Sequence, residues 1–169
     1  MDARGGHDGG GAADRGGDGG NRGMGLETCR HLGRRGYRVV LTSRETAAGE
    51  AAAAKLREED GLEVECFRLD LTRAQDIAAL VAHVRRRLAR VYAVVNNAGI
   101  YLEFAGSTVR DRTSMFDAQL PVVRAIVETN LLGPFALSQG LVAMMRERGY
   151  GRVVNLVSAM GQFADTIRS

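Results

Sequence analysis

The chain has 169 residues, 45% of them hydrophobic, so its length and composition suit one domain with a buried core. Its formal net charge is +3, and the basic residues are scattered along the chain. Such scattering favours solvated helix ends over a nucleic-acid-binding face, and we expect no nucleic-acid partner. The two cysteines, Cys29 and Cys66, lie in apolar patterns that indicate neither a disulfide framework nor a metal site.

The amino terminus carries no targeting signal that the sequence reveals. It has no apolar stretch, and its aspartates argue against a transit peptide. No segment reaches the length expected of a membrane-spanning helix. We therefore expect a soluble, cytoplasmic protein without a membrane partner.

The first part of the chain differs in composition from the rest. Eleven of the 22 glycines fall within the first 25 residues, and such a density of glycine opposes packing. Residues 1–18 are therefore predicted to be a disordered, glycine-rich tail. From Gly25 onward, Leu26, Cys29 and Leu32 mark one face of a helix that ends near 33–36.

Strands and helices alternate after this first helix. Residues 37–42 (YRVVLT), 62–69 (LEVECFRL), 91–95 (VYAVV) and 152–157 (RVVNLV) are predicted to be buried strands. An alanine-rich helix between the first two strands extends to about Glu58 and is ended by Gly61. Thr72 and Gln75 predict a capping box for the next helix. Its apolar residues recur at helical spacing: Ile77, Leu80, Val81, Val84 and Leu88.

A long helix is predicted between the last two strands. A polar connection over 103–119 leads into it, and it continues to about Arg148. Pro134 predicts a bend near 130–133, because proline lacks the N–H that a regular helix needs. Strands that alternate with helices at this spacing predict a parallel sheet covered on both faces. The predicted fold class is doubly wound α/β.

A glycine-rich turn precedes the first helix. Residues 18–25 read DGGNRGMG, with Gly19, Gly23 and Gly25 in the turn. Glycines permit a tight turn, and the helix N-terminus supplies free N–H groups that suit a phosphate. Such a turn normally follows an apolar strand, and residues 1–17 contain no apolar run. The alternative is that Gly23 and Gly25 only close a helix against a strand.

Motifs in a fixed order make the chain resemble the short-chain dehydrogenase/reductase family over about 19–161. The family motif TGxxxGxG is similar to DGGNRGMG, with Asp18 at the threonine position, and NNAG occurs at 96–99. The family's helix asparagine matches Asn130 in TNLLGPF, and its catalytic serine matches Ser158 in GRVVNLVSAMG. The resemblance implies a Rossmann-like fold and hydride transfer between a nicotinamide cofactor and a small carbonyl or alcohol substrate.

The resemblance also implies which residues contact the cofactor. The glycine turn holds the phosphates, the residues after the second predicted strand meet the adenine, and NNAG lies on the ribose side. The implied cofactor residues are Gly19, Asn21, Arg22, Gly23, Met24, Gly25, Arg44, Asp70, Leu71, Asn97, Ala98 and Gly99. Asn96 is expected to tie neighbouring strands together. The alternative for Asp70 is a place beside a helix cap, where aspartate is common.

Arg44 bears on the choice of cofactor. In the family, an acidic residue after the strand that corresponds to 37–42 of this chain accepts the ribose hydroxyls and selects NAD. This chain has Ser43 and Arg44 there, and Arg22 lies in the glycine turn. Two guanidinium groups favour a 2′-phosphate through charge-assisted hydrogen bonds, so NADP(H) is the expected cofactor. The alternative is that Arg44 is a solvated arginine at a helix start.

The resemblance assigns catalysis to Ser158 and Asn130. The serine hydrogen-bonds the substrate oxygen, and the asparagine holds a water in a proton relay. The alternatives are a turn-forming serine and an asparagine tolerated at a bend. The family also uses a Tyr-x-x-x-Lys pair about a dozen residues beyond the serine. None of the chain's tyrosines has a lysine four residues later, because Lys55 is its only lysine.

The resemblance implies that parts of the family fold are missing. These are the first strand, central in the family between 37–42 and 91–95, and the C-terminal third, which forms the substrate pocket and commonly a dimer surface. We therefore expect 19–169 to be a partial NAD(P)-binding Rossmann domain. It would be an inactive fragment of an NADP(H)-dependent oxidoreductase that forms oligomers only when complete. The alternative is a shortened, non-catalytic relative that binds nucleotide or a partner subunit.

Overall fold

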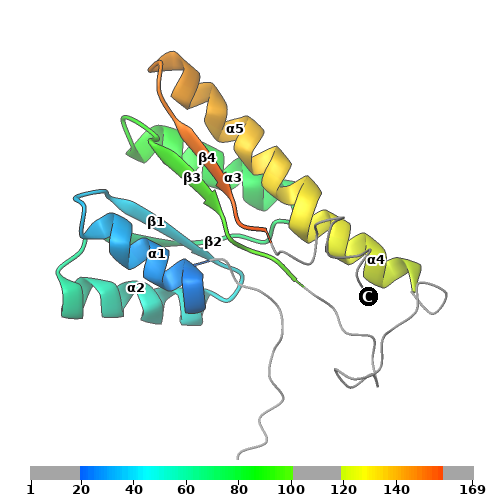
Figure 1. Cartoon of the computed structure of the whole chain (residues 1–169), viewed down its shortest axis with the longest axis horizontal. Coiled ribbons are helices and arrows are strands. Elements are labelled where there is room, and N and C mark those ends of the chain that lie inside the picture. Colours follow the sequence, from blue (N-terminus) through cyan, green and yellow to red (C-terminus); the bar gives the residue numbers. More distant parts are fainter. Residues whose placement is uncertain (1–19, 101–118, 158–169) are drawn as a thin grey trace, which may run out of the picture.

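Helices and strands alternate along the part of the chain that the structure describes. The structure, a computed structural model, describes residues 20–100 and 119–157 (Figure 1). The predictions for the tail at 1–18, for Gly19, for most of the polar connection and for Ser158 lie outside these residues. The described elements are α1 (Gly23–Gly33), β1 (Val39–Ser43), α2 (Thr46–Asp60), β2 (Val64–Arg68), α3 (Ala74–Arg87), β3 (Ala93–Asn96), α4 (Leu120–Val127), the π-helical turn η2 (Glu128–Leu132), α5 (Gly133–Glu147) and β4 (Arg152–Asn155).

All described strands pair in parallel, but they form two separate sheets. β1 pairs with β2 with Val39 opposite Val64, and β3 pairs with β4 with Ala93 opposite Arg152. Within the described residues, no strand lies between β1 and β3. The parallel α/β class is confirmed, and the gap lies where the family resemblance implied a missing central strand.

Two hydrophobic clusters cover opposite faces of the strands. Val39 and Leu41 of β1 pack with α1 and α2, whereas Val40 packs on the other side. The second cluster joins α3, β3 and α5, where Leu80 and Leu141 are both buried. Side chains that alternate between two helical layers are the mark of a doubly wound sheet. Figure 1 shows α1 and α2 beside β1 and β2, and α3 and α5 beside β3 and β4.

The prediction for the C-terminus of α2 is confirmed, and the one for the N-terminus of α3 is wrong. α2 ends at Gly61, which has a φ of 65° that favours glycine, as predicted. The capping box predicted for α3 is wrong, because the N-cap is Arg73 and no side chain caps the helix. Thr72 instead donates from its hydroxyl to Asp70 Oδ1 over 2.7 Å and from its N–H over 3.0 Å. A capping box would need the Thr72 hydroxyl oxygen to accept from a helix N–H, but this residue instead closes the turn before the helix by donating to Asp70.

The long helix predicted between the last strands is continuous over Leu120–Glu147, which is 28 residues. The π-helical turn η2 lies where Pro134 predicted a bend, and its wider hydrogen bonding replaces regular α-helix there. By length and composition this helix could cross a membrane, so the expectation that no segment is that long is wrong. The core helix of a soluble protein meets the same criterion, and α5 buries Leu137, Leu141, Met144 and Met145.

β4 differs from the sequence prediction in its burial. All of its residues are exposed, including Val153 and Val154, although the pattern predicted a buried strand. The apolar pattern records which side chains suit burial, but burial requires a neighbouring layer. Within the described residues, β4 has β3 on one edge and no second strand on the other.

Candidate functional site

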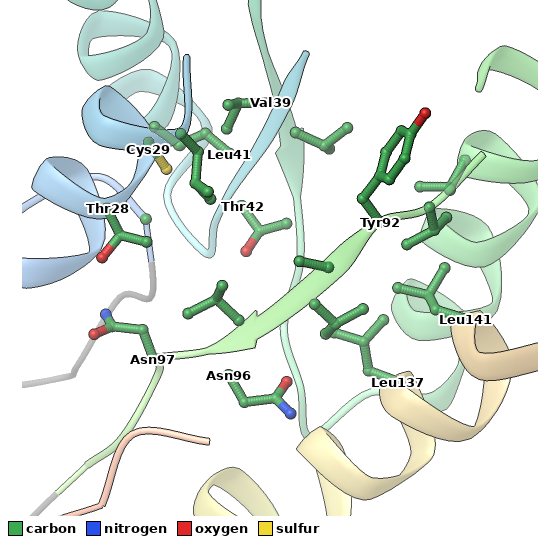
Figure 2. A pocket seen from close by; sticks show the side chains of 18 of the residues that line it. Thr28, Cys29, Val39, Leu41, Thr42, Tyr92, Asn96, Asn97, Leu137 and Leu141 are labelled. Atoms are coloured by element: carbon green, nitrogen blue, oxygen red, sulfur yellow. The ribbon is translucent and has the colours of Figure 1, made fainter. Parts of the chain in front are cut away.

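The predicted site residues that the structure describes gather at the carboxyl ends of the parallel strands. Arg44 follows β1, Asp70 follows β2 and Asn97 follows β3. The glycine turn that enters α1 and the residues after β3 line one cavity of about 290 Å³ (Figure 2). This edge is where open α/β sheets bind their ligands.

The glycine turn lies directly against β1. A Cβ at Gly20 would lie 2.9 Å from Leu41 Cγ and 3.0 Å from the Thr42 carbonyl oxygen, so a side chain there would force β1 to shift. Gly23 has a φ of +55°, a conformation that also favours glycine. Sequence reasoning singled out Gly19, Gly23 and Gly25 and missed Gly20. The signal for Gly20 was its place in a glycine pair just before the helix.

Among the described residues, no side chain caps the N-terminus of α1. Its N-cap residue, Arg22, makes no side-chain cap hydrogen bond, and the first turn contains no acidic residue. The Oδ1 atom of Asn21 is buried and has no hydrogen-bond partner among the described residues. A helix N-terminus presents uncompensated N–H groups and a positive dipole. This end of α1 therefore suits an anionic ligand, and Asn21 can accept a hydrogen bond from a hydroxyl there.

Asp70 is engaged in its own turn and lies near Arg44. Besides the two bonds from Thr72, its Oδ2 lies 3.4 Å from Arg73 Nε. Partial burial raises the pKa of Asp70, but the hydrogen bonds from Thr72 and the charges of Arg73 and Arg44 outweigh it and lower the pKa. The carboxylate is thus ionised at neutral pH, and the positive charge of half-buried Arg44, after β1, favours that ionised form.

Leu71 packs against the start of α5. A Cβ at Gly133 would lie 2.5 Å from the Leu71 carbonyl oxygen and 2.7 Å from its Cβ. The turn after β2 is therefore held against the junction of η2 and α5. The sequence placed Gly133 only at a predicted bend, because nothing local in the chain reveals a contact with residue 71.

The two asparagines at the end of β3 have different surroundings. Asn96 Nδ2 donates to Asn155 Oδ1 over 2.7 Å and to Ser138 Oγ over 3.0 Å. The expectation that Asn96 ties neighbouring strands together is confirmed. Asn97 lines the cavity, and Figure 2 shows it after β3 on the same side of the view as Thr28.

Asn130 holds the chain that follows NNAG. Its Oδ1 accepts a hydrogen bond from the Ile100 N–H over 2.8 Å, and its Nδ2 donates to the Ile100 carbonyl over 2.8 Å. Gly99 lies beside it, since a Cβ there would be 3.8 Å from Asn130 Oδ1. The sequence assigned Asn130 to a water-holding role and could not foresee this long-range clamp. Its catalytic partner by prediction, Ser158, lies outside the described residues.

The chemistry available elsewhere in the described residues is limited. Burial raises the pKa of Cys29 to about 11, so its thiol is protonated at neutral pH and is a packing group rather than a nucleophile. Among residues 20–100 and 119–157, no cluster of histidine, cysteine and acidic residues could hold a metal ion.

Comparisons with known proteins agree with this architecture. The family model described as short chain dehydrogenase matches residues 18–167. An acetoacetyl-CoA reductase of Rhizobium meliloti is 33% identical, covering 85% of this chain and 54% of that protein. A (+)-neomenthol dehydrogenase of Capsicum annuum is 27% identical over 85% of this chain and 55% of its own length. The chain thus spans about half the length of the curated relatives it matches.

Solved structures show the same likeness. An actinorhodin polyketide ketoreductase with NADPH has a TM-score of 0.74 at 33% identity, covering 84% of this chain and 51% of that one. A metagenomic short-chain oxidoreductase in complex with NADP has a TM-score of 0.73 at 28% identity, covering 84% and 60%. The family model covers most of the chain, and the structural likeness extends over the same elements. The chain belongs to the short-chain dehydrogenase family.

Proposed function

We propose that this chain carries the cofactor-binding part of an NADP(H)-dependent oxidoreductase. The observation that carries the proposal is the N-terminus of α1, which no described side chain caps and which Gly20 holds against the carboxyl end of β1. Helix N-termini at this place in parallel sheets bind phosphates. Solved relatives that are complexes with NADP or NADPH support the same cofactor for this chain.

Each part of the cofactor has residues that suit it. The glycine turn would hold the phosphates, Arg22 and Arg44 would pair with the 2′-phosphate, and the buried Asn21 Oδ1 would accept from a hydroxyl. Residues after β2 and β3 would meet the adenine and the ribose. The proposed cofactor residues are Gly19, Asn21, Arg22, Gly23, Met24, Gly25, Arg44, Asp70, Leu71, Asn97, Ala98 and Gly99.

The proposed reaction moves a hydride between the nicotinamide and a carbonyl or alcohol carbon of a small substrate. The bound cofactor supplies or accepts that hydride. In this proposal Ser158 hydrogen-bonds the substrate oxygen. Asn130 holds the backbone of Ile100 with both amide atoms, and its Oδ1 can accept one further hydrogen bond from a water. It would thus order the segment after NNAG while it holds that water.

We propose that the 169 residues alone do not turn over substrate. Ser158 and Asn130 can orient groups but cannot deliver a proton as a lysine-activated tyrosine does, and such a group contributes about 10²–10⁴-fold in rate. NADPH oxidation measured by absorbance against a panel of ketones and aldehydes should stay at the uncatalysed rate. Measurable turnover that depends on Ser158 would show that these residues suffice for the chemistry.

The cofactor preference is tested by titrating the chain with NADPH and NADH while following nicotinamide fluorescence. We expect tighter binding of NADPH, and Arg44→Ala should lower that preference about tenfold, the value of one charge-assisted hydrogen bond. Arg87→Ala, at the exposed end of α3, is the matched control and should change nothing. Equal affinities for the two cofactors, or a preference that survives Arg44→Ala, would contradict the proposal.

A second candidate is a non-catalytic relative that binds nucleotide or a partner subunit. The exposed apolar side chains of the long helix favour it, since Leu131 is 61% and Phe135 64% exposed. Adding a family-like C-terminal segment that contains Tyr-x-x-x-Lys separates the two candidates. Turnover in the extended chain supports the oxidoreductase, and nucleotide binding without turnover supports the relative. The cytoplasmic location and the absence of nucleic-acid partners stay predictions.

A further inference from the structure

Three turns at the amino ends of the strands repeat one short pattern. An arginine stands two residues before a tyrosine in 35–37 (RGY), 90–92 (RVY) and 148–150 (RGY). These turns join α1 to β1, α3 to β3 and α5 to β4. Figure 2 shows Tyr92 at the end of β3 opposite to Asn97. The repeated pattern therefore lies at the edge of the strands opposite to the candidate cofactor site.

α1 and α5 end in the same backbone arrangement. Gly36 has a φ of +82° and Gly149 a φ of +67°, the left-handed conformation that glycine adopts after a helix. The N–H of the following tyrosine, Tyr37 or Tyr150, donates in each case to the carbonyl five residues earlier over 3.2 Å. This cap fixes how the chain leaves the helix, so the two tyrosines start from equivalent positions.

The three tyrosine rings form one cluster. The rings of Tyr37 and Tyr92 pack edge to face with centroids 5.7 Å apart, and those of Tyr92 and Tyr150 with centroids 6.5 Å apart. The Arg152 N–H donates to the Tyr92 carbonyl over 2.9 Å, which aligns the starts of β3 and β4. Each tyrosine is between 41% and 48% exposed, so the cluster forms part of the surface.

Two guanidinium groups lie over these rings. Arg90 Cζ is 5.3 Å from the centroid of the Tyr92 ring, and Arg152 Cζ is 4.7 Å from that of the Tyr150 ring. Attraction between a cation and a ring face orders each planar group and leaves N–H donors for an anion. We call Tyr37, Arg90, Tyr92, Tyr150 and Arg152 the tyrosine–arginine patch.

Positive charge dominates this edge of the molecule. The turns from helix to strand are residues 34–38, 61–63, 88–92 and 148–151. They contain five arginines and one acidic residue, Glu63, whose carboxylate lies 3.3 Å from Arg38 Nε. Within the described residues, Arg90 and Arg152 form no ion pair, and Arg152 donates to the neutral Gly151 carbonyl over 3.1 Å. The patch therefore attracts anions.

The covered ring faces decide which anion fits. A single-stranded nucleic acid needs free aromatic faces on which its bases stack. Here Arg90 and Arg152 each cover a face of a tyrosine, and the rings meet one another edge to face. A guanidinium group instead matches a carboxylate, which accepts two parallel N–H bonds from it. Carboxylates are therefore favoured over stacked bases.

The spacing of the two arginines favours an extended chain with acidic residues at alternate positions. The rings of Tyr92 and Tyr150, over which they lie, have centroids 6.5 Å apart. Residues i and i+2 of a strand point to the same side and are about 7 Å apart. Two such carboxylates can thus meet the two guanidinium groups at once.

We propose that the tyrosine–arginine patch binds an acidic, extended segment of another protein. Arg90 and Arg152 pair with two of its carboxylates, and the exposed tyrosine rings contact the side chains between them. The patch and the glycine turn lie at opposite ends of α1. Binding of the acidic segment therefore does not depend on the proposed cofactor.

The test uses the full 169-residue chain and a fluorescein-labelled peptide, Gly-Glu-Thr-Glu-Thr-Glu-Thr-Glu-Gly. Fluorescence anisotropy at low ionic strength should show saturable binding that weakens as salt is added. The same peptide with glutamine in place of every glutamate should not bind. Absence of saturable binding, or equal binding of the glutamine peptide, would overturn the proposal.

Paired substitutions locate the site. Arg90→Gln with Arg152→Gln should weaken binding about tenfold, because two exposed ion pairs with the peptide are lost. Lys55→Gln with Arg124→Gln removes the same charge from exposed positions of α2 and α4 and should change little. Equal weakening by the two pairs of substitutions would mean attraction to net charge alone and would contradict the proposal.

Replacement by lysine separates carboxylate recognition from charge. Arg90→Lys with Arg152→Lys keeps both charges but loses the planar fork of donors that matches a carboxylate. The affinity for the acidic peptide should fall about threefold, less than in the glutamine variant. Parent-like binding by the lysine variant would contradict the proposed carboxylate pairs.

Two competitors distinguish this site from others. Saturating NADPH should not displace the peptide, and displacement would place the peptide at the cofactor site. An oligothymidylate of the same charge should bind more weakly than the peptide, and tighter binding would identify a nucleic-acid site. Either of these contrary outcomes would overturn the proposal.

Discussion

At the scale of single residues, Asn130 has a structural role that its residue type alone does not reveal. Both of its amide atoms bond the backbone of Ile100, from a position 30 residues further along the chain. An asparagine side chain offers a donor and an acceptor side by side, which matches the N–H and C=O of one residue. The segment after NNAG is therefore held by the helix that contains η2.

Substitution of Asn130 tests this clamp. Asn130→Ala should cost two hydrogen bonds, each worth about 0.5–1.5 kcal/mol net, and should speed amide exchange at Ile100. Asn130→Asp should also speed exchange, because its second carboxylate oxygen would face the Ile100 carbonyl oxygen without a donor. Gln139→Ala, at an exposed position of α5, is the control. Exchange at Ile100 measured by NMR should rise in both Asn130 variants and not in the control, and equal rates in all chains would contradict these hydrogen bonds.

At the scale of elements, α1 and α2 are joined by ion pairs at their ends. Asp60 at the end of α2 accepts from Arg30 Nε over 2.8 Å and from Arg34 Nη2 over 2.6 Å. Hydrogen bonds from Arg30 and Arg34 lower the pKa of Asp60. The pairs tie the helix that carries the glycine turn to the helix that follows Arg44.

The pH dependence of this link has a definite sign. A carboxyl pKa that is lower in the folded state stabilises the fold above the unfolded value of about 3.9, and the stabilisation is lost as the pH falls through the folded value. Asp60 titrated by carboxyl NMR should therefore show a pKa below 3.9, and Arg34→Gln should raise it. Protection of α1 amides should fall over that acid range in the parent chain but not in Asp60→Asn. An ordinary pKa for Asp60 would contradict the pairing.

At the scale of the whole molecule, we expect the gap between the two described sheets to lower the stability of the fold. A central strand normally buries about five apolar side chains at roughly 2 kcal/mol each, on the order of 10 kcal/mol in all. A complete domain has a net stability of only about 5–15 kcal/mol. Residues 1–18 are rich in glycine and aspartate, which are poor strand formers.

We therefore expect the purified chain to unfold without a sharp transition. Circular dichroism during heating should show a gradual loss of helix rather than one cooperative step. A single sharp transition in the chain alone would show that the two sheets suffice for a stable core.

The sequence by itself determined the order of the elements and the fold class. Apolar spacing along a strand or helix is a local property, so α1, α3 and β1 lie within a few residues of their predicted places. Glycine indicates a backbone conformation with positive φ, which is why Gly23 and Gly61 were placed correctly at turns. Motif order was likewise enough to identify the family.

The tertiary structure alone decided which groups meet. Gly20 is favoured because β1 lies against it, and Thr72 turns to Asp70 rather than capping α3. The exposure of β4 depends on which layers surround it. These outcomes follow from contacts between residues far apart in the chain or, for Thr72, from a local hydrogen bond to Asp70. Periodicity and motifs report the structural preference of one segment. Whether that segment is then buried, paired or capped depends on neighbours that only folding brings into contact.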